Sequence, residues 1–369
     1  MDFEFDLATP ADDPALRRLL ADSPMPGRLT VAFEREPNYF LGCGTMGRTW
    51  QIVVARHKAT GEIAGVMCRG IRPYFINGQP QDLGYIGQIR IAEKYRGLWL
   101  LQRGLHYFRQ LHADGRVPAY WGMISDENAV ARGVLVERQR KSFPVARLLT
   151  RFHTLGIILR RPLKALPFPG ALERGAVETL PEIVAFLRRE GARRQLFPAY
   201  DEQDFNGGPA TLGFDVRDFL VARRDGAICG VLGLWDQAGY KQSVVRGYDR
   251  SLRLLRPFYN LGARLLGAAP LPAAGEHIHS AYASFICVAD DDLGTFAALL
   301  RAAYNLAAER RYAHLMLGMA EGDPLLAEAL HYAHISYWSR LYVGYWEQDA
   351  GKFYEGLDRR GAYCEIAML

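Results

Sequence analysis

Two different rhythms of hydrophobic and polar positions follow one another along residues 84–111. The first stretch, 84–91, carries β-branched bulk at Ile86, Ile89 and Ile91, which is typical of a strand. The second stretch, 98–111, has apolar side chains three or four positions apart, the one-sided spacing of an amphipathic helix. The pattern therefore predicts a strand and a helix, joined by a short basic turn that ends at Gly97.

Such a strand–turn–helix directs several unpaired backbone N–H groups, and the positive end of the helix dipole, to one place. That place suits a phosphate group. Two interpretations stay open at this point: an anion site around Arg96 and Gly97, or an ordinary connection with a solvated arginine.

The remaining elements of the first half are predicted from the same patterns. A helix is expected over 12–21, a hairpin over 51–56 and 62–67, a buried strand over 119–124 and a short helix from 128 to 135. Residues 158–175 contain three prolines and interrupt any regular pattern, so we expect them to connect two domains.

The pattern then restarts. A helix is predicted over 181–195, a second hairpin over 218–224 and 227–235, a strand over 279–288, a helix over about 294–310 and a strand over 313–319. A helix near 324–334 and strands over 339–346 and 362–368 follow. The order of elements and the recurring Val-Ala-Arg, turn glycine and Gly-Val of the two hairpins indicate an internal repeat of domain size.

Composition and length agree with two soluble mixed α/β (α+β) domains. At 369 residues the chain exceeds the usual size of one core, and no run of eighteen apolar residues predicts a transmembrane helix. Five scattered cysteines without a C-x-x-C pair, and an acidic start without a signal peptide, favour a reduced, cytoplasmic protein without a zinc site.

Charge is unevenly distributed. Residues 132–164 hold nine Lys or Arg and one acid, so the net charge of this band is +8. The rest of the chain has a net charge of −3, which gives the total of +5. A band of this kind meets the phosphates of a cofactor, a nucleic acid or an anionic membrane, or is simply a solvated face.

The stretch Ile91-Ala-Glu-Lys-Tyr-Arg-Gly97 resembles the acyl-coenzyme A motif of the GNAT superfamily of acyltransferases. The resemblance extends to Asn128-Ala-Val-Ala and to the order of elements over about 20–155. It implies two consecutive GNAT-like domains, each a mostly antiparallel mixed sheet flanked by helices. The predicted boundaries are 1–157, a linker over 158–175, and 176–369.

The resemblance also implies the site. The residues it assigns to acyl-coenzyme A are Ile89, Ile91, Arg96, Gly97, Leu98, Trp99, Leu100, Leu101 and Asn128. The chain departs from the family where glycine or a small residue is expected, at Trp99 and Leu101, and has Leu135 where a tyrosine often acts as general acid.

Catalytic candidates on the central strand are few, because Tyr85–Arg90 contains no carboxylate to act as a base. The polar groups of the strand are Tyr85, Gln88 and Arg90, and Glu93 lies at the turn that follows; Tyr85, Gln88 and Glu93 are the catalytic candidates. In the second copy the phosphate turn is replaced by Ala289-Asp-Asp-Asp-Leu-Gly294, whose carboxylates repel a diphosphate. We therefore expect the first domain to hold the acyl donor, with no metal in either.

Three functions follow. The first is transfer of an acyl group, acetyl in the expected case, from acyl-coenzyme A to an amine of a small molecule or peptide. The second, implied by tandem-GNAT enzymes that use charged tRNA, would direct the basic band toward RNA. The third is a non-catalytic binding protein, favoured by Trp99, Leu135 and the missing carboxylate.

Overall fold

The computed structural model describes residues 2–97, 99–137, 143–346 and 352–369. The strands are β1 (Phe3–Leu7), β2 (Leu29–Glu34), β3 (Thr49–His57), β4 (Ile63–Ile76), β5 (Gln79–Ile91), β6 (Tyr120–Ser125), β7 (Val145–Ile158), β8 (Ala171–Arg174), β9 (Phe197–Pro198), β10 (Phe219–Arg224), β11 (Ala227–Asp236), β12 (Gln242–Tyr248), β13 (Ser280–Val288), β14 (His314–Ala320) and β15 (His334–Tyr345). The helices are α1 (Asp13–Ala21), α2 (Leu100–His112), α3 (Ala129–Arg132), α4 (Leu180–Gly191), α5 (Glu202–Phe205), α6 (Arg250–Leu266), α7 (Leu293–Glu309), α8 (Leu326–Ala329) and α9 (Lys352–Glu355).

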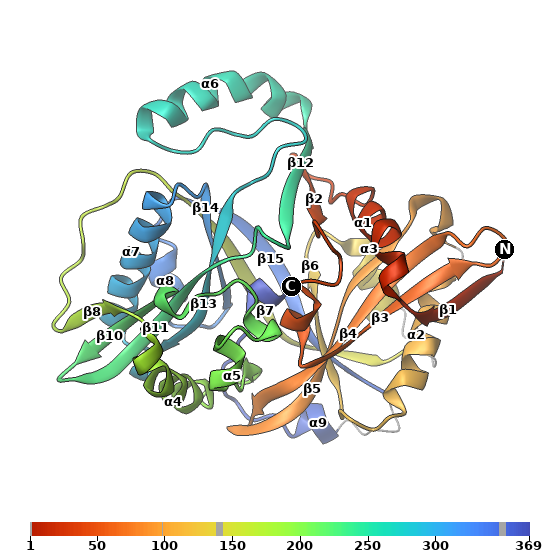
Figure 1. Ribbon diagram of the computed structural model, residues 1–369, viewed down its shortest axis with the longest axis horizontal. Coiled ribbons are helices and arrows are strands. Elements are labelled where there is room, and N and C mark those ends of the chain that lie inside the picture. Colours follow the sequence, from red (N-terminus) through yellow and green to blue (C-terminus); the bar gives the residue numbers. More distant parts are fainter. Residues whose placement is uncertain (1, 98, 138–142, 347–351) are drawn as a thin grey trace.

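One large mixed sheet runs through the molecule, with helices on both faces (Figure 1). Its strand order is β1-β3-β4-β5-β6-β15-β7-β14-β13-β11-β10-β8, with β9 pairing on β4. Both parallel contacts, β5 with β6 and β13 with β14, are short and lie at corresponding places of the two halves. The mixed α/β class and the layered arrangement predicted from the sequence are confirmed.

Both halves repeat the same local geometry. In each, an antiparallel hairpin, a further long strand, a short turn and an amphipathic helix follow in this order: β3, β4, β5 and α2 in the first half, and β10, β11, β13 and α7 in the second, where β12 and α6 are inserted between β11 and β13. Burial of Leu105 and Phe108 on α2, and of Phe296 and Leu299 on α7, fixes the face that each helix turns to the sheet.

The two halves exchange a strand at the centre of the sheet. β15, which comes near the end of the chain, lies between β6 and β7 and pairs antiparallel with both. β7, which ends the first half, pairs in turn with β14 of the second half. The central core cluster accordingly joins Trp121 of β6, Phe152 of β7 and Leu341 of β15.

A smaller contact also links the halves. β2 and β12 form a two-stranded sheet, and the side chain of Gln242, the first residue of β12, accepts a hydrogen bond from the Glu36 amide at 2.9 Å. β12 then leads to α6, which stands away from the rest of the molecule at the top of Figure 1.

Several sequence predictions need correction. The stretch 158–175 is not wholly irregular, because Ala171–Arg174 forms the edge strand β8 on β10. The predicted helix over 324–334 is reduced to Leu326–Ala329, and the predicted strand over 362–368 is wrong: those residues form an isolated bridge at Ala362 and a 3₁₀ turn, Ile366–Met368. Among the described residues, no helix is both long and apolar enough to cross a membrane.

Candidate functional site

The strands β5 and β6 separate at the centre of the first half. They pair only at Gly84 with Tyr120 and at Tyr85 with Trp121, although both strands continue. Just beyond, β5 bulges away from β4, and Gln88 adopts a left-handed conformation with φ of 54°. The bulge leaves Gln88 without a partner residue in the β4–β5 register. This splayed edge of β5 includes the predicted residues Ile89 and Ile91, both partly buried.

The basic turn follows directly. Gly97 has φ of 80°, a left-handed conformation that a glycine adopts without strain. Trp99 precedes α2 with φ of 59°, and its side chain is 61% exposed, so the indole does not fill a buried pocket. Arg96 is exposed, and no carboxylate of the described residues lies within 4 Å of it. Leu98 lies outside the described residues.

The start of α2 is therefore open to an anion. The first turn of α2 contains no acidic residue and no side chain caps it. In the part of the chain that the structure describes, the amides of Leu100 and Leu101 donate to no other backbone group outside the helix. Glu93 is exposed at the beginning of the preceding 3₁₀ turn.

In the second half the corresponding helix start is occupied by the protein itself. Asp292 Oδ1 accepts hydrogen bonds from the Thr295 amide at 2.7 Å and from the Thr295 hydroxyl at 2.6 Å. Asp290 pairs with Arg193, and Asp291 pairs with Arg194. Asp292 thus caps the start of α7.

The second bulge is occupied as well. Phe285 has φ of 57° at the place in β13 where Gln88 lies in β5. The Phe285 amide donates to Glu365 Oε2 at 2.8 Å, and the Tyr363 hydroxyl donates to the same oxygen. By contrast, no side chain of the described residues accepts a hydrogen bond from the Gln88 amide. The first half therefore keeps an open bulge and an open helix start, where the second half fills both.

Burial shifts the pKa of Tyr85 upward, and the side chain packs in the central core with its ring 4.7 Å from that of Trp121. The Tyr85 hydroxyl lies directly over Gly87, where a Cβ atom would come within 1.9 Å of it. Tyr85 is therefore a neutral phenol beside the bulge, able to donate or accept a hydrogen bond but unable to serve as an anionic base near neutral pH.

Positive side chains gather on the same side of β5 as Tyr85. Arg35 is buried, and its guanidinium donates to the Cys43 sulfur at 3.3 Å. The Arg90 guanidinium donates to the backbone carbonyl of Ile89 at 3.0 Å. Burial lowers the pKa of Arg90. No carboxylate of the described residues lies within 4 Å of either guanidinium. These three residues, Arg35, Tyr85 and Arg90, together with Lys241, which is described next, are called the central cluster.

Lys241, contributed by the second half, was not predicted from the sequence. It lies just before β12, with its ammonium group 5.1 Å from the Tyr282 ring centroid and donating to the Ala367 carbonyl at 3.3 Å. Burial, reinforced by the nearby Arg35 charge, lowers the pKa of Lys241 to about 7. A lysine of this kind is partly neutral at physiological pH, which is what a general base requires.

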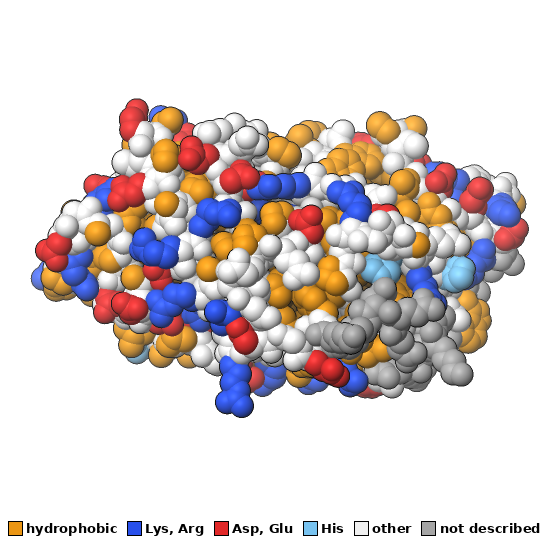
Figure 2. Space-filling model, turned by 90° about the horizontal axis from the view of Figure 1, so that it is seen from below, with side chains coloured by type: hydrophobic (Ala, Val, Ile, Leu, Met, Phe, Trp, Pro, Cys, Tyr) orange, Lys and Arg blue, Asp and Glu red, His pale blue; other side chains and the backbone are white. Residues whose placement is uncertain are grey.

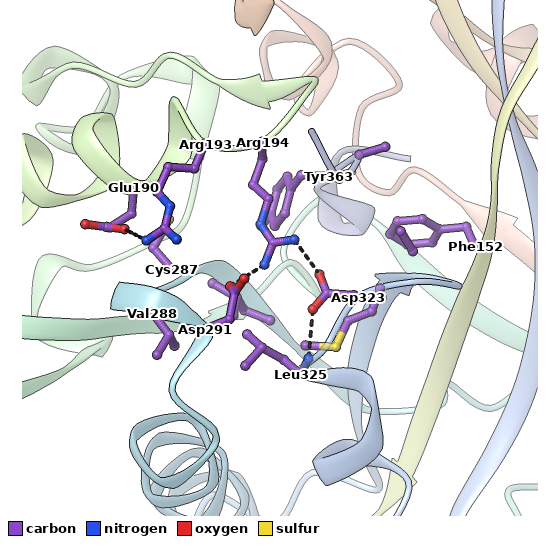
Figure 3. Close-up of a pocket in the computed structure, with 16 residues that line it drawn as sticks. Phe152, Glu190, Arg193, Arg194, Cys287, Val288, Asp291, Asp323, Leu325 and Tyr363 are labelled. Atoms are coloured by element: carbon purple, nitrogen blue, oxygen red, sulfur yellow. Dashed lines mark hydrogen bonds and ion pairs between the residues drawn. The ribbon is translucent and has the colours of Figure 1, made fainter. Parts of the chain in front are cut away.

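Two cavities lie beside the splayed strands. A small apolar cavity of about 20 Å³ lies between β4, β5 and α2, next to Ile89 and Leu101. A larger one of about 160 Å³ lies beside the splay of β13 and β14 in the second half (Figure 3). There Arg194 bridges Asp291 and Asp323, so these charges are satisfied within the protein.

Two further groups that could be taken for site residues are Asn128 and Cys43, of which Cys43 contacts Arg35 of the central cluster. Asn128 caps α3, accepting from the Ala131 amide at 3.0 Å, and is exposed. Cys43 is buried, which raises the pKa of its thiol to about 12 and removes it as a thiolate nucleophile. Within the basic band, Arg151 pairs with Asp126 and Glu321, so part of the band is neutralised. The described residues contain no cluster of three or more metal-binding side chains.

Comparison with known proteins gives structural likeness only. No protein-family model matches the chain, and no curated protein matches it by sequence. Among solved structures, N-myristoyltransferase of Saccharomyces cerevisiae with bound myristoyl-CoA superposes with a TM-score of 0.63 at 11% identity, covering 93% of this chain and 82% of that one.

Two acetyltransferase structures agree. The GCN5-related glucosamine N-acetyltransferase region of a fungal multi-domain GH3 β-N-acetylglucosaminidase gives a TM-score of 0.60 at 14% identity, over 93% of this chain and 38% of that one. A GCN5-related N-acetyltransferase from Sphaerobacter thermophilus gives 0.54 at 15% identity, over 92% and 95%. The chain therefore has the GCN5-related N-acetyltransferase (GNAT) fold, in the form of two GNAT-like halves that share one sheet.

Proposed function

We propose that this protein transfers an acyl group from acyl-coenzyme A to an amine of a small molecule or peptide. The observation that supports the proposal most directly is the contrast between the halves. The bulge amide and the helix start are bonded to Glu365 and Asp292 in the second half, whereas the same positions in the first half have no such partner among the described residues. The three solved structures compared above, which have the same fold, are those of an N-myristoyltransferase and two N-acetyltransferases.

In this proposal the diphosphate of the donor binds at the start of α2. Arg96 and the amides of Gly97, Leu100 and Leu101 supply hydrogen bonds and positive charge, and Trp99 lies beside the coenzyme. The open edge of β5 around Gln88–Ile91 holds the thioester carbonyl. A backbone amide there would stabilise the oxygen as it gains negative charge in the transition state.

Lys241 is the base that we assign. The acceptor amine attacks the thioester carbonyl carbon, its proton passes to the neutral Lys241 amine, and the bond from carbon to the coenzyme sulfur breaks. The sulfur leaves as a thiolate and recovers a proton from the lysine or from solvent, so charge and atoms balance. This assignment replaces the carboxylate that Tyr85–Arg90 does not provide, and leaves Tyr85 and Gln88 as positioning groups.

Acetyl is the acyl group that we favour. The apolar cavity beside Ile89 and Leu101 has a volume of about 20 Å³. A space of that size holds about one water molecule or one methyl group. A longer chain would need Met67 or Leu101, which also line the cavity, to move.

Calorimetric titration with acetyl-coenzyme A tests the donor site. We expect Arg96→Gln to weaken binding about tenfold or more, because one charge-assisted hydrogen bond to phosphate is lost. Arg359→Gln, at an exposed arginine of the C-terminal segment, is the matched control and should bind like the unaltered protein. Failure of the unaltered protein to bind the coenzyme would remove the proposed function.

A further inference from the structure

The most unusual surface of the molecule is the outward face of α6. Four side chains at i, i+4, i+7 and i+11 form one stripe along this helix and are largely exposed: Leu254 (74%), Phe258 (74%), Leu261 (62%) and Leu265 (73%). Leu255 and Leu266, both more than half exposed, widen the stripe. A surface helix of a globular protein normally turns such a stripe to the core.

Here the polar side of the helix faces the loop that follows it, residues 267–275. Arg256 Nε donates to the Leu271 carbonyl at 3.1 Å, and the Asn260 side chain bonds both the carbonyl and the amide of Leu271. Ala263 is the buried apolar residue on this inner side. The hydrogen bonds therefore hold α6 with its leucines directed away from the protein, at the edge of the molecule in Figure 1.

The charges of this segment all have one sign. Residues 250–275 contain four arginines and no Asp or Glu. Arg250 and Arg253 are exposed, and at about 100° per residue they lie along one border of the apolar stripe. On the opposite face of the molecule, by contrast, basic and acidic side chains are interspersed (Figure 2).

We propose that α6 docks the protein on an anionic membrane surface, lying in the plane of the interface with the leucine stripe among the lipid chains and Arg250 and Arg253 at the phosphates. An apolar face bordered by arginines, on a helix too short and too polar to span, is the pattern of an interfacial helix. A second copy of the chain fits less well, because a symmetric contact would bring arginines together with no carboxylate to meet them.

Vesicle flotation with the full chain tests this inference. We expect binding to mixed phosphatidylcholine–phosphatidylglycerol vesicles and at least about tenfold weaker binding to phosphatidylcholine alone. The combined variant Leu254→Ser, Phe258→Ser and Leu261→Ser should weaken binding to the mixed vesicles about tenfold or more. Arg250→Gln with Arg253→Gln should reduce the preference for the anionic lipid.

A matched control removes exposed apolar side chains elsewhere, with Val130→Ser and Val177→Ser, which are 79% and 67% exposed. It should bind vesicles like the unaltered protein, and circular dichroism should show all variants folded. The inference is overturned if the unaltered protein stays free of anionic vesicles or if the leucine variant binds them equally. A dimer in sedimentation that the leucine variant dissolves, without vesicle binding, would assign the stripe to a second copy and overturn it too.

Discussion

Gln88 and Phe285 hold the same left-handed backbone conformation at the same bulge of the two halves, with φ of 54° and 57°. Their side chains have opposite surroundings: Gln88 is partly exposed, and Phe285 is fully buried among Phe214, Trp235 and Tyr200. The Phe285 amide is bonded to Glu365, whereas among the described residues no side chain accepts a hydrogen bond from the Gln88 amide. The repeat therefore preserves the backbone geometry while only one half keeps the exposed site.

The two bulges should respond differently to glycine. Gln88→Gly relieves a conformation that costs an L-residue roughly 1–2 kcal/mol, so we expect unchanged or slightly increased stability, by up to about 1 kcal/mol. Phe285→Gly has the same backbone benefit but loses a buried ring, and should cost about 3 kcal/mol or more. Urea unfolding measures both. Equal effects at the two positions would contradict the distinct roles of the bulges.

Lys241 should govern the pH dependence of transfer. Since burial lowers the pKa of Lys241 to about 7, the rate should rise as the pH increases through 7 and level off above. Lys241→Gln should reduce kcat by about 10²-fold or more and abolish this rise. Steady-state rates across pH, with acetyl-coenzyme A binding as the control for folding, provide the measurement. A rise that persists in Lys241→Gln would assign the base to another group.

The same lysine makes stability pH-dependent with a defined sign. Between pH 7 and 10.5 the unfolded chain keeps the Lys241 proton while the folded chain has released it, so folding becomes more favourable as the pH rises. In Lys241→Met this contribution should vanish. Comparison of the two unfolding free energies at several pH values in that window checks the sign; a folded state that raised the pKa above 10.5 would give no difference in slope between the two proteins there.

Glu365 gives the opposite dependence. Burial raises the pKa of this carboxyl, although the Phe285 amide and Tyr363 hydroxyl oppose the shift. Its contribution to stability is thus complete below pH 4.5 and is lost as the pH rises through the higher folded-state pKa. Glu365→Gln keeps an oxygen that accepts from the Phe285 amide, and should remove the decrease of the unfolding free energy with rising pH. Glu365→Ala leaves the Phe285 amide without this acceptor and should lower the unfolding free energy by about 1–3 kcal/mol. Denaturant titrations at several pH values distinguish them.

The exchanged strand predicts that the halves do not fold alone. A fragment of residues 1–157 lacks β15, which leaves the edges of β6 and β7 unpaired in the middle of the sheet. We expect this fragment to aggregate and to regain a folded state when residues 158–369 are produced with it. Cleavage within 158–175 of the intact protein should therefore leave the two pieces associated in size-exclusion chromatography. A folded, monomeric 1–157 fragment would contradict the prediction. The domain boundaries themselves stay a prediction.

Local pattern was sufficient for much of this fold. The β-branched residues before Gly97 and the apolar spacing after it predicted β5 and α2, and the two similar hairpins predicted the repeat. These features depend on residues that are only a few positions apart along the chain, so they can be predicted from the sequence. The long strand β7 was not predicted, and neither was α6, whose apolar stripe covers no core.

The strand order at the centre of the sheet and the surroundings of Lys241 were decided only by the tertiary structure. The insertion of β15 between β6 and β7 joins residues about 200 positions apart, and strand pairing over that separation leaves no local signature. The pKa of Lys241 likewise depends on burial and on Arg35, which the chain brings near it only when folded. The sequence by itself determined two similar halves, and its acidic turn at 289–294 already marked the second helix start as unsuited to a diphosphate; the bond from the Phe285 amide to Glu365, 80 residues away, was decided only by the tertiary structure, because no local pattern brings those residues together.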